Sequence, residues 1–107
     1  MGVTDSSHFS TKHNSISELA KAISHPARVA IIDYLLKENG CICNDIVDSL
    51  PLSQPTVSQH IKALKQAGLI VGEIKGNSIC YYVNKSSITK LKKYMDKLSE
   101  KLEKLIP

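Results

Sequence analysis

The chain has 107 residues, 42% of them hydrophobic, and a formal net charge of +4. These values fit one small globular domain and exclude a disordered chain, and a shared interface would extend the limited core of a monomer. The positive charge favours a polyanionic partner, and the absence of a long apolar run or a signal-peptide core predicts a cytoplasmic protein with no membrane partner.

The first half of the chain predicts a short series of small elements. Residues 1–14 are polar and lack periodicity, which predicts a flexible N-terminal arm. Apolar residues recur at helical spacing over residues 15–23, and a more apolar helix over residues 26–37 is expected to be the central core element. Residues 41–43 suit a short extended strand, and Asn44 is placed to cap a short helix that ends near residue 50.

The stretch from Leu52 to Leu69 predicts the helix around which the chain is organised. Ser53 is a suitable N-cap, Pro55 is tolerated in a first helical turn, and Gly68 supplies the left-handed residue that often ends a helix. One apolar stripe runs along this helix and consists of Val57, Ile61 and Leu64.

Polar side chains lie off that stripe, near the start and middle of the same helix. Short hydrogen-bonding groups and a cation are the types that bind base edges and phosphates in a DNA major groove. The predicted DNA-binding set on this helix is Ser53, Gln54, Thr56, Ser58, Gln59 and Lys62. Two helices joined by a few turn residues, the second with a polar exposed face, predict a helix-turn-helix.

A β-hairpin is predicted directly after this helix. Two apolar, β-branched-rich runs over residues 69–75 and 78–83 flank a glycine–asparagine turn. A hairpin in this position is the wing of a winged helix. Its tip carries Lys75, Asn77 and Ser78, where contact with a phosphate or the minor groove is expected.

The last segment, about residues 85–106, carries an apolar stripe with heptad spacing. The stripe consists of Ile88, Leu91, Met95, Leu98, Leu102 and Leu105. So long a stripe needs a partner surface, and we expect a second copy of the chain, with packing on its own N-terminal helices as the alternative. The predicted fold class is mostly α with a small β-hairpin: a dimeric winged helix-turn-helix domain over residues 15–107.

Three stretches resemble the ArsR/SmtB family of small bacterial winged-helix repressors. They are AISHPARVAIIDYL (22–35), LSQPTVSQHIKALKQAGLI (52–70) and GNSICYYV (76–83). The resemblance implies a homodimeric repressor on a palindromic double-stranded DNA operator, released when an inducer binds. It also implies that residues 53–67 form the recognition helix, that His60 has a DNA-binding or structural role, and that the first and last helices form the dimer interface. The implied interface residues are Ile16, Leu19, Ile88, Leu91, Met95, Leu98 and Leu102.

The cysteines are the candidate inducer site. Cys41 and Cys43 would share one face of a regular strand, and Cys80 lies in the hairpin with which such a strand pairs in winged helices. Three converging thiolates would suit arsenite, antimonite or a soft metal ion, whereas isolated thiols would pack as buried hydrophobes. Sensing of an oxidant or persulfide through the cysteines, and the absence of any cysteine-borne inducer, are the alternatives.

The family resemblance does not transfer ligand roles to these cysteines. Aligned on Asp45–Ile46, the family's Cys-Val-Cys-Asp-Leu motif would put its cysteines at Ile42 and Asn44, one position after those of this chain. The family's zinc site on the C-terminal helix uses histidines, and this segment has none.

No enzymatic function is expected, because the sequence shows no nucleophile elbow, phosphate loop or paired carboxylates. No cofactor is required for the predicted function. The remote alternative to a DNA-binding repressor is a winged helix that serves only as a protein-interaction module.

Overall fold

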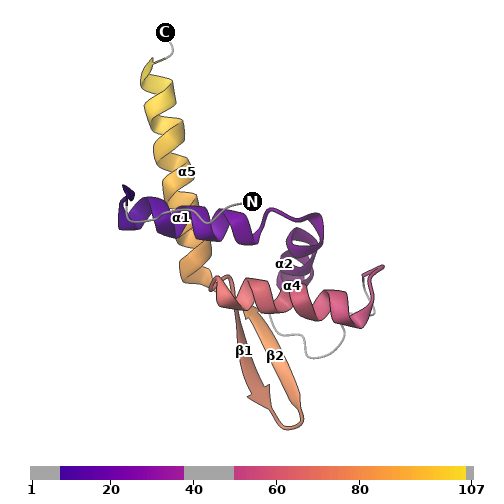
Figure 1. The fold of residues 1–107 in the computed structure, drawn as a ribbon. Coiled ribbons are helices and arrows are strands. Elements are labelled where there is room, and N and C mark those ends of the chain that lie inside the picture. Colours follow the sequence, from indigo (N-terminus) through magenta and orange to yellow (C-terminus); the bar gives the residue numbers. More distant parts are fainter. Residues whose placement is uncertain (1–7, 38–49, 106–107) are drawn as a thin grey trace.

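The computed structural model describes residues 8–37 and 50–105, which form a winged-helix arrangement with a projecting last helix (Figure 1). The elements in chain order are α1 (Thr11–Ala22), α2 (Pro26–Lys37), α4 (Gln54–Gln66), β1 (Ile70–Lys75), β2 (Ser78–Val83) and α5 (Lys85–Leu105). The strand predicted at residues 41–43 and most of the helix predicted up to residue 50 lie outside the described residues. No described helix combines the length and apolar character that crossing a bilayer requires.

Helix α1 begins four residues before the start predicted from the sequence. Ser10 is its N-cap, and the Ser10 side chain accepts a hydrogen bond from the backbone N–H of His13 (3.0 Å). Residues 11–14 are therefore helical rather than part of an arm. Their side chains carry no apolar stripe because this first turn faces solvent or is only partly covered, so periodicity alone could not reveal it.

The core lies where α1, α2, α4 and the start of the hairpin meet. Helix α2 has the predicted bounds and contributes three buried side chains. The buried apolar cluster consists of Leu19, Ala22, Ile31, Ile32, Leu35, Val57, Leu64, Leu69 and Ile70. Helix α2 is not buried all round, however, since Val29 is 45% and Leu36 59% exposed.

Helix α4 confirms the helix predicted in the middle of the chain. Ser53 is its N-cap, and Pro55 lies in its first turn. Proline is tolerated there because the backbone N–H groups of a first turn make no hydrogen bond within the helix. Gly68 follows the C-cap with φ +81°, a conformation that costs other residues steric strain. Val57 and Leu64 anchor the helix in the core and leave its opposite side to solvent.

The predicted hairpin is also confirmed. Strands β1 and β2 pair antiparallel, with Ile70 opposite Val83 at the base and Lys75 opposite Ser78 at the tip. Ile70 is buried at the base, whereas the rest of β1 is exposed, so the hairpin extends away from the core as a wing (Figure 1).

Helix α5 is the longest element and has no fully buried residue. Its beginning packs on the core through Leu91, and it then passes α1 and projects beyond the rest of the molecule (Figure 1). The resulting shape is elongated, with principal extents of 53 × 32 × 25 Å.

Asn84 joins the end of α4 to the start of α5. Its backbone N–H donates to the Leu69 carbonyl (2.8 Å), and its Nδ2 donates to the Gly68 carbonyl (2.9 Å). Its Oδ1 accepts a hydrogen bond from the backbone N–H of Ser86 (3.0 Å), so the Asn84 side chain caps the start of α5. The Ser87 hydroxyl also donates to the Gly68 carbonyl (2.6 Å), so the two helices share a hydrogen-bonded junction.

Candidate nucleic-acid interface

The solvent-facing side of α4 carries most of the polar residues predicted from the sequence to bind DNA. Gln54, Ser58, Gln59 and Lys62 are exposed. Ser53 and Thr56 lie at the helix start, where the two hydroxyl oxygens are 2.9 Å apart and Ser53 also accepts from the backbone N–H of Thr56. Side chains on a helix anchored from behind are held in fixed positions, as groove recognition requires.

A hollow of about 270 Å³ lies between α4 and the wing. Ser58, Lys62 and Lys65 of α4 line it together with Tyr81 of β2. The Lys65 ammonium lies 5.8 Å from the centre of the Tyr81 ring, within cation–π range. Lys65 is not among the residues predicted to bind DNA, although its position three residues after Lys62 places it on the same side of the helix.

Gly72 makes this arrangement possible. A Cβ atom at this position would lie 3.3 Å from the Tyr81 ring and 3.6 Å from Cε of Lys65. The absence of a side chain on β1 therefore lets the tyrosine and the lysine lie across the strand. The hollow thus combines two cations with an aromatic ring, a surface suited to a phosphate and its sugar.

The tip of the wing is exposed at Lys75 and Asn77 and partly covered at Ser78. The Lys75 ammonium lies 5.9 Å from the centre of the Tyr82 ring. Ile74, at 79% exposure, adds an apolar group beside these polar side chains.

His60 lies on the partly covered side of α4 and contacts residues near the start of α2. Its Nδ1 accepts a hydrogen bond from Nε of Arg28 (3.1 Å), and its ring centre is 4.5 Å from that of His25. Arg28 also donates from Nη1 to the Ala22 carbonyl at the end of α1 (3.2 Å). Arg28 therefore links three helices, a role that its position in the sequence does not disclose.

The surroundings of His60 lower its pKa below the ordinary histidine value. The cause is first its desolvation and then the charges of His25 and Arg28. A neutral ring with an unprotonated Nδ1 is the form that can accept from Arg28. This geometry supports the structural alternative for His60, in which the ring positions α4 against α2.

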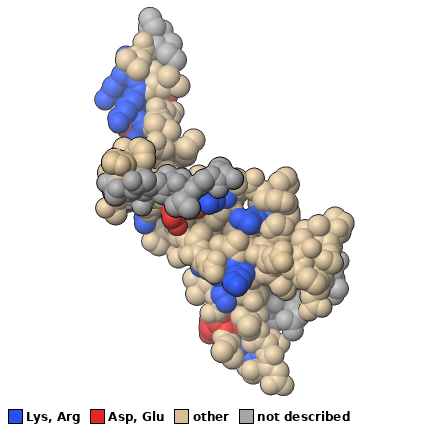
Figure 2. All heavy atoms as spheres, in the orientation of Figure 1, with Lys and Arg blue, Asp and Glu red and all other residues tan. Residues whose placement is uncertain are grey.

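Many positive side chains are visible on the face of the molecule drawn in Figure 2. Figure 2 shows blue atoms near the junction of α4 with the hairpin and along the projecting part of α5, with a red patch on the wing. The first group lies beside the exposed face of α4, where its positive charges would attract a polyanion.

The candidate inducer site is described only in part. Cys41 and Cys43 lie outside the described residues, and Cys80 is fully buried on β2 and disulfide-bonded. Within residues 8–37 and 50–105, no three His, Cys, Asp or Glu side chains gather as metal ligands would.

The residues predicted to form a dimer interface fall into two groups. Leu19 is buried in the core of its own protomer, and Leu91 packs against that core, so neither leaves a large apolar surface for a partner. The others leave apolar surface at least partly uncovered, and they are Ile16, Ile88, Met95, Leu98 and Leu102.

Comparison with known proteins identifies the family that the chain resembles. Residues 25–71 match the family model described as bacterial regulatory protein, arsR family. The chain is 40% identical over 68 residues to the HTH-type transcriptional repressor SmtB of Mycobacterium tuberculosis, a match that covers 64% of this chain. The match covers 50% of that repressor, so the chain spans about half the length of this relative.

A second relative and a solved structure match more completely. The chain is 30% identical over 84 residues to the arsenical resistance operon repressor of Staphylococcus xylosus, covering 78% of this chain and 80% of that protein. The solution structure of a homodimeric winged helix-turn-helix DNA-binding domain from Mycobacterium bovis aligns with a TM-score of 0.68 at 21% identity, covering 95% of this chain and 93% of that one.

The likeness to that structure confirms the winged helix-turn-helix fold, and the sequence matches cover both the α2 segment and the α4 helix with its polar face. The chain belongs to the ArsR family of bacterial regulatory proteins.

Proposed function

We propose that this protein is a transcriptional repressor that binds a palindromic DNA operator as a homodimer. The observation that carries the proposal is the geometry of α4, which is anchored by Val57 and Leu64 and presents Gln54, Gln59 and Lys62 to solvent. Glutamine can pair bidentately with adenine in the major groove, and lysine can bind phosphate or guanine. The hollow beside Lys65 and the wing would add phosphate contacts that position α4.

Two-fold symmetry supports the proposed DNA-binding mode. Each protomer offers a single described helix with a polar face beside a wing, too few base contacts for high specificity. Two copies would place their α4 helices in successive major grooves about 34 Å apart. The uncovered apolar face of α5, with Met95 59% and Leu102 57% exposed, is the surface we assign to the partner copy.

The deciding experiment is a titration of labelled DNA from upstream of the protein's own gene at several salt concentrations. A DNA-binding repressor should lose affinity steeply as salt rises. The double variant Lys62→Ser, Lys65→Ser should weaken binding and flatten the plot of log affinity against log salt by about 0.9 for each phosphate that is no longer neutralised. The control is Lys92→Ser, Lys104→Ser on α5, which removes the same charge away from α4.

A second pair of variants tests how the bases are recognised. Gln54→Ala or Gln59→Ala should reduce discrimination between operator and mutated operator by about 1–3 kcal/mol for each bidentate pair with a base that the substitution removes. Affinity that is independent of salt and of both sets of substitutions would reject the DNA-binding face and favour the protein-interaction module.

For the inducer, we propose a thiol-binding metalloid or soft metal ion. The relative from Staphylococcus xylosus carries arsenical resistance in its name, and Cys80 lies buried on β2 of the wing, directly before Tyr81 in the sequence. The chain has only two further cysteines, Cys41 and Cys43. Binding of an ion by deprotonated thiols from two segments would change the position of the wing relative to the core.

The disulfide bond of Cys80 favours a second candidate, a response to oxidant. In that case two thiols form the disulfide, and their two electrons and two protons pass to an oxidant such as hydrogen peroxide. Disulfides of cytosolic proteins more often sense redox state than support the fold.

One titration separates the two candidates. Reduced protein bound to operator DNA is challenged with arsenite or with hydrogen peroxide, and the same challenges are applied to Cys80→Ser and Cys43→Ser. Release by arsenite that both substitutions abolish supports the metalloid. Release by peroxide alone supports the redox response, and retention of DNA under both challenges rejects a cysteine-borne inducer.

A further inference from the structure

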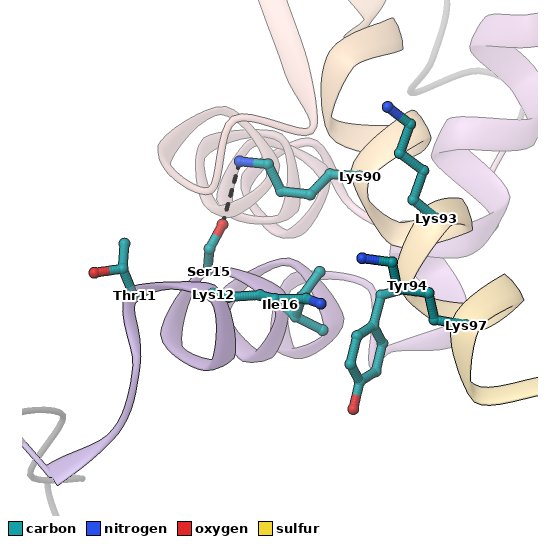
Figure 3. A pocket seen from close by; sticks show the side chains of 8 residues that line it. All are labelled: Thr11, Lys12, Ser15, Ile16, Lys90, Lys93, Tyr94 and Lys97. Carbon is teal, nitrogen blue, oxygen red and sulfur yellow. Dashed lines mark hydrogen bonds between the residues drawn. The ribbon is translucent and has the colours of Figure 1, made fainter. Parts of the chain in front are cut away.

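A hollow of about 430 Å³ lies between α1 and α5, away from α4 and the wing (Figures 1 and 3). Its size is within the range of small-molecule sites in proteins. Its lining residues are Thr11, Lys12, Ser15, Ile16, Lys90, Lys93, Tyr94 and Lys97. Its described lining includes neither Cys80 nor any α4 residue that we propose to bind DNA.

Among the described residues, four lysines and no acidic residue line this hollow. Lys90 reaches across from α5, and its ammonium donates to the Ser15 hydroxyl of α1 (3.3 Å, dashed in Figure 3). Lys12 extends from α1 towards α5, with its ammonium 5.8 Å from the centre of the Tyr94 ring. Lysines from both helices therefore meet around one space.

These charges are crowded rather than neutralised. The charge of Lys97 is the largest cause that lowers the pKa of Lys12, followed by slight desolvation and a contact with the same Lys97 side chain. The ion pair found on α5 lies elsewhere, because Asp96 binds Lys92 (2.7 Å) and neither residue lines the hollow. An anion placed between Lys12 and Lys97 would relieve this repulsion.

Besides the lysines, the lining has two hydroxyl side chains, Thr11 and Ser15, and an apolar part. Ile16 and the Tyr94 ring form the apolar part, and the lysine stems add further methylene surface. Inorganic anions use only the charges of such a site, whereas an organic anion with an aromatic or aliphatic body would use both parts. Aromatic rings and cations around one hollow favour a flat body with an acidic group.

The hollow is also compatible with a dimer formed through α5. Its α5 residues Lys90, Tyr94 and Lys97 are spaced by four and three, so they share one side of the helix. The exposed apolar residues Met95 and Leu98 directly follow Tyr94 and Lys97 in the sequence, so they lie on a side rotated by about 100°. A partner copy on the apolar stripe of α5 would leave the lysine side of that helix open, and of the described lining residues only Ile16 is also implied in the dimer interface.

We propose that this hollow is a binding site for a small organic anion with an apolar body. Lys12 and Lys97 bind the acidic group, and Ile16 and Tyr94 contact the body. The proposal does not depend on the proposed function, since the ligand would bind the free protein whether or not the chain recognises an operator.

The test uses the full chain without DNA and the fluorescent probe 1-anilinonaphthalene-8-sulfonate, an aromatic body with one sulfonate. Its affinity is compared with that of N-phenyl-1-naphthylamine, the same body without the charge. Lys12→Gln, Lys97→Gln should weaken binding of the sulfonate about tenfold. Lys92→Gln, Lys104→Gln removes two charges outside the hollow and should change it less than about twofold.

Tyr94→Ala tests the apolar part of the site separately from the charged part. It should weaken binding of both the charged and the neutral probe. Equal loss of affinity in the two lysine double variants would overturn the proposal in favour of general electrostatic attraction. Equal affinity for the charged and neutral probes, unaffected by Lys12 and Lys97, would assign the binding to the exposed stripe of α5 and overturn it as well. Absence of saturable sulfonate binding to the unmodified chain would have the same consequence.

Discussion

Helices α4 and α5 are both amphipathic, yet they use their apolar sides differently. Helix α4 places Val57 and Leu64 in the core of its own protomer, where they are 1% and 0% exposed. Helix α5 is longer, but its described residues include none that is fully buried, and Met95, Leu98 and Leu102 remain exposed. A helix with packed apolar residues is stabilised within one chain, whereas an uncovered stripe needs a second surface.

The contrast divides the molecule by task. The half formed by the inner side of α1, α2, α4 and the base of the hairpin shares one buried core, so it is self-contained and holds the polar face of α4 in place. The other half, formed by α5 and the outer side of α1, leaves Met95, Leu98 and Leu102 exposed in one protomer, and to it we assign the partner copy and the small-molecule site.

The largest expected effect comes from breaking the self-contained half. Leu64→Ala removes a completely buried side chain and should lower the free energy of unfolding by about 2–5 kcal/mol. Urea denaturation followed by circular dichroism measures this loss. Leu105→Ala on α5, 80% exposed in one protomer, is the matched control and should cost far less; similar losses would contradict the contrast.

A charge on the apolar stripe should break the other half without unfolding the first. Leu98→Glu is expected to weaken self-association more than about tenfold, because a buried carboxylate would lack a partner. Sedimentation equilibrium measures the change, and circular dichroism checks that helix content is kept. Thr89→Glu lies off the stripe and adds the same charge, so an equal effect of both variants would exclude the assigned interface.

Loss of the junction between the halves should have an intermediate effect. Asn84→Ala removes the cap of α5 and the hydrogen bond to the Gly68 carbonyl, which together should cost about 1–3 kcal/mol. Asn84→Ser keeps a capping hydroxyl and should recover part of the loss. Urea midpoints at one fixed protein concentration measure both, and identical values for Ala and Ser would show that the cap is unimportant.

The smallest expected effect concerns pH and the contact of α4 with α2. The pKa of His60 is lowered in the folded chain, so the unfolded chain binds more protons between the folded and unfolded pKa values. Stability is therefore complete above the unfolded pKa and falls as pH drops towards the folded one. From about pH 7.5 to 5.5, unfolding free energy should fall more steeply for the unmodified chain than for His60→Asn. Parallel pH profiles would contradict this role of His60.

Local signals make much of the fold predictable. Pro55 and Gly68 mark the two ends of α4, and the glycine–asparagine turn fixes the hairpin, because each depends on backbone preferences that neighbouring residues determine. Ser10 escapes prediction as a cap because the first turn of α1 lacks the apolar spacing that reveals a helix.

The parts of the site that escape prediction depend on contacts between distant segments. Arg28 and His60 are 32 residues apart, and Lys12 meets Tyr94 only after α1 crosses α5. Periodicity assigns a residue to a side of its own helix but not to the element that this side will meet. The place of Gly72 beside the Tyr81 ring, where a Cβ atom would be tight at 3.3 Å, is likewise visible only in the folded hairpin.

The hydrogen bonds of Asn84 couple the start of α5 to the end of α4. Because the Asn84 side chain binds both the Gly68 carbonyl and the first turn of α5, a rotation of α5 in an assembled dimer would displace the end of α4. In a pair of such chains, the crossing angle of the two α5 helices would then set the distance between the two α4 helices. A change of a few degrees at one end would be enough to put these helices out of step with the helical repeat of DNA, with every base-contacting side chain unaltered.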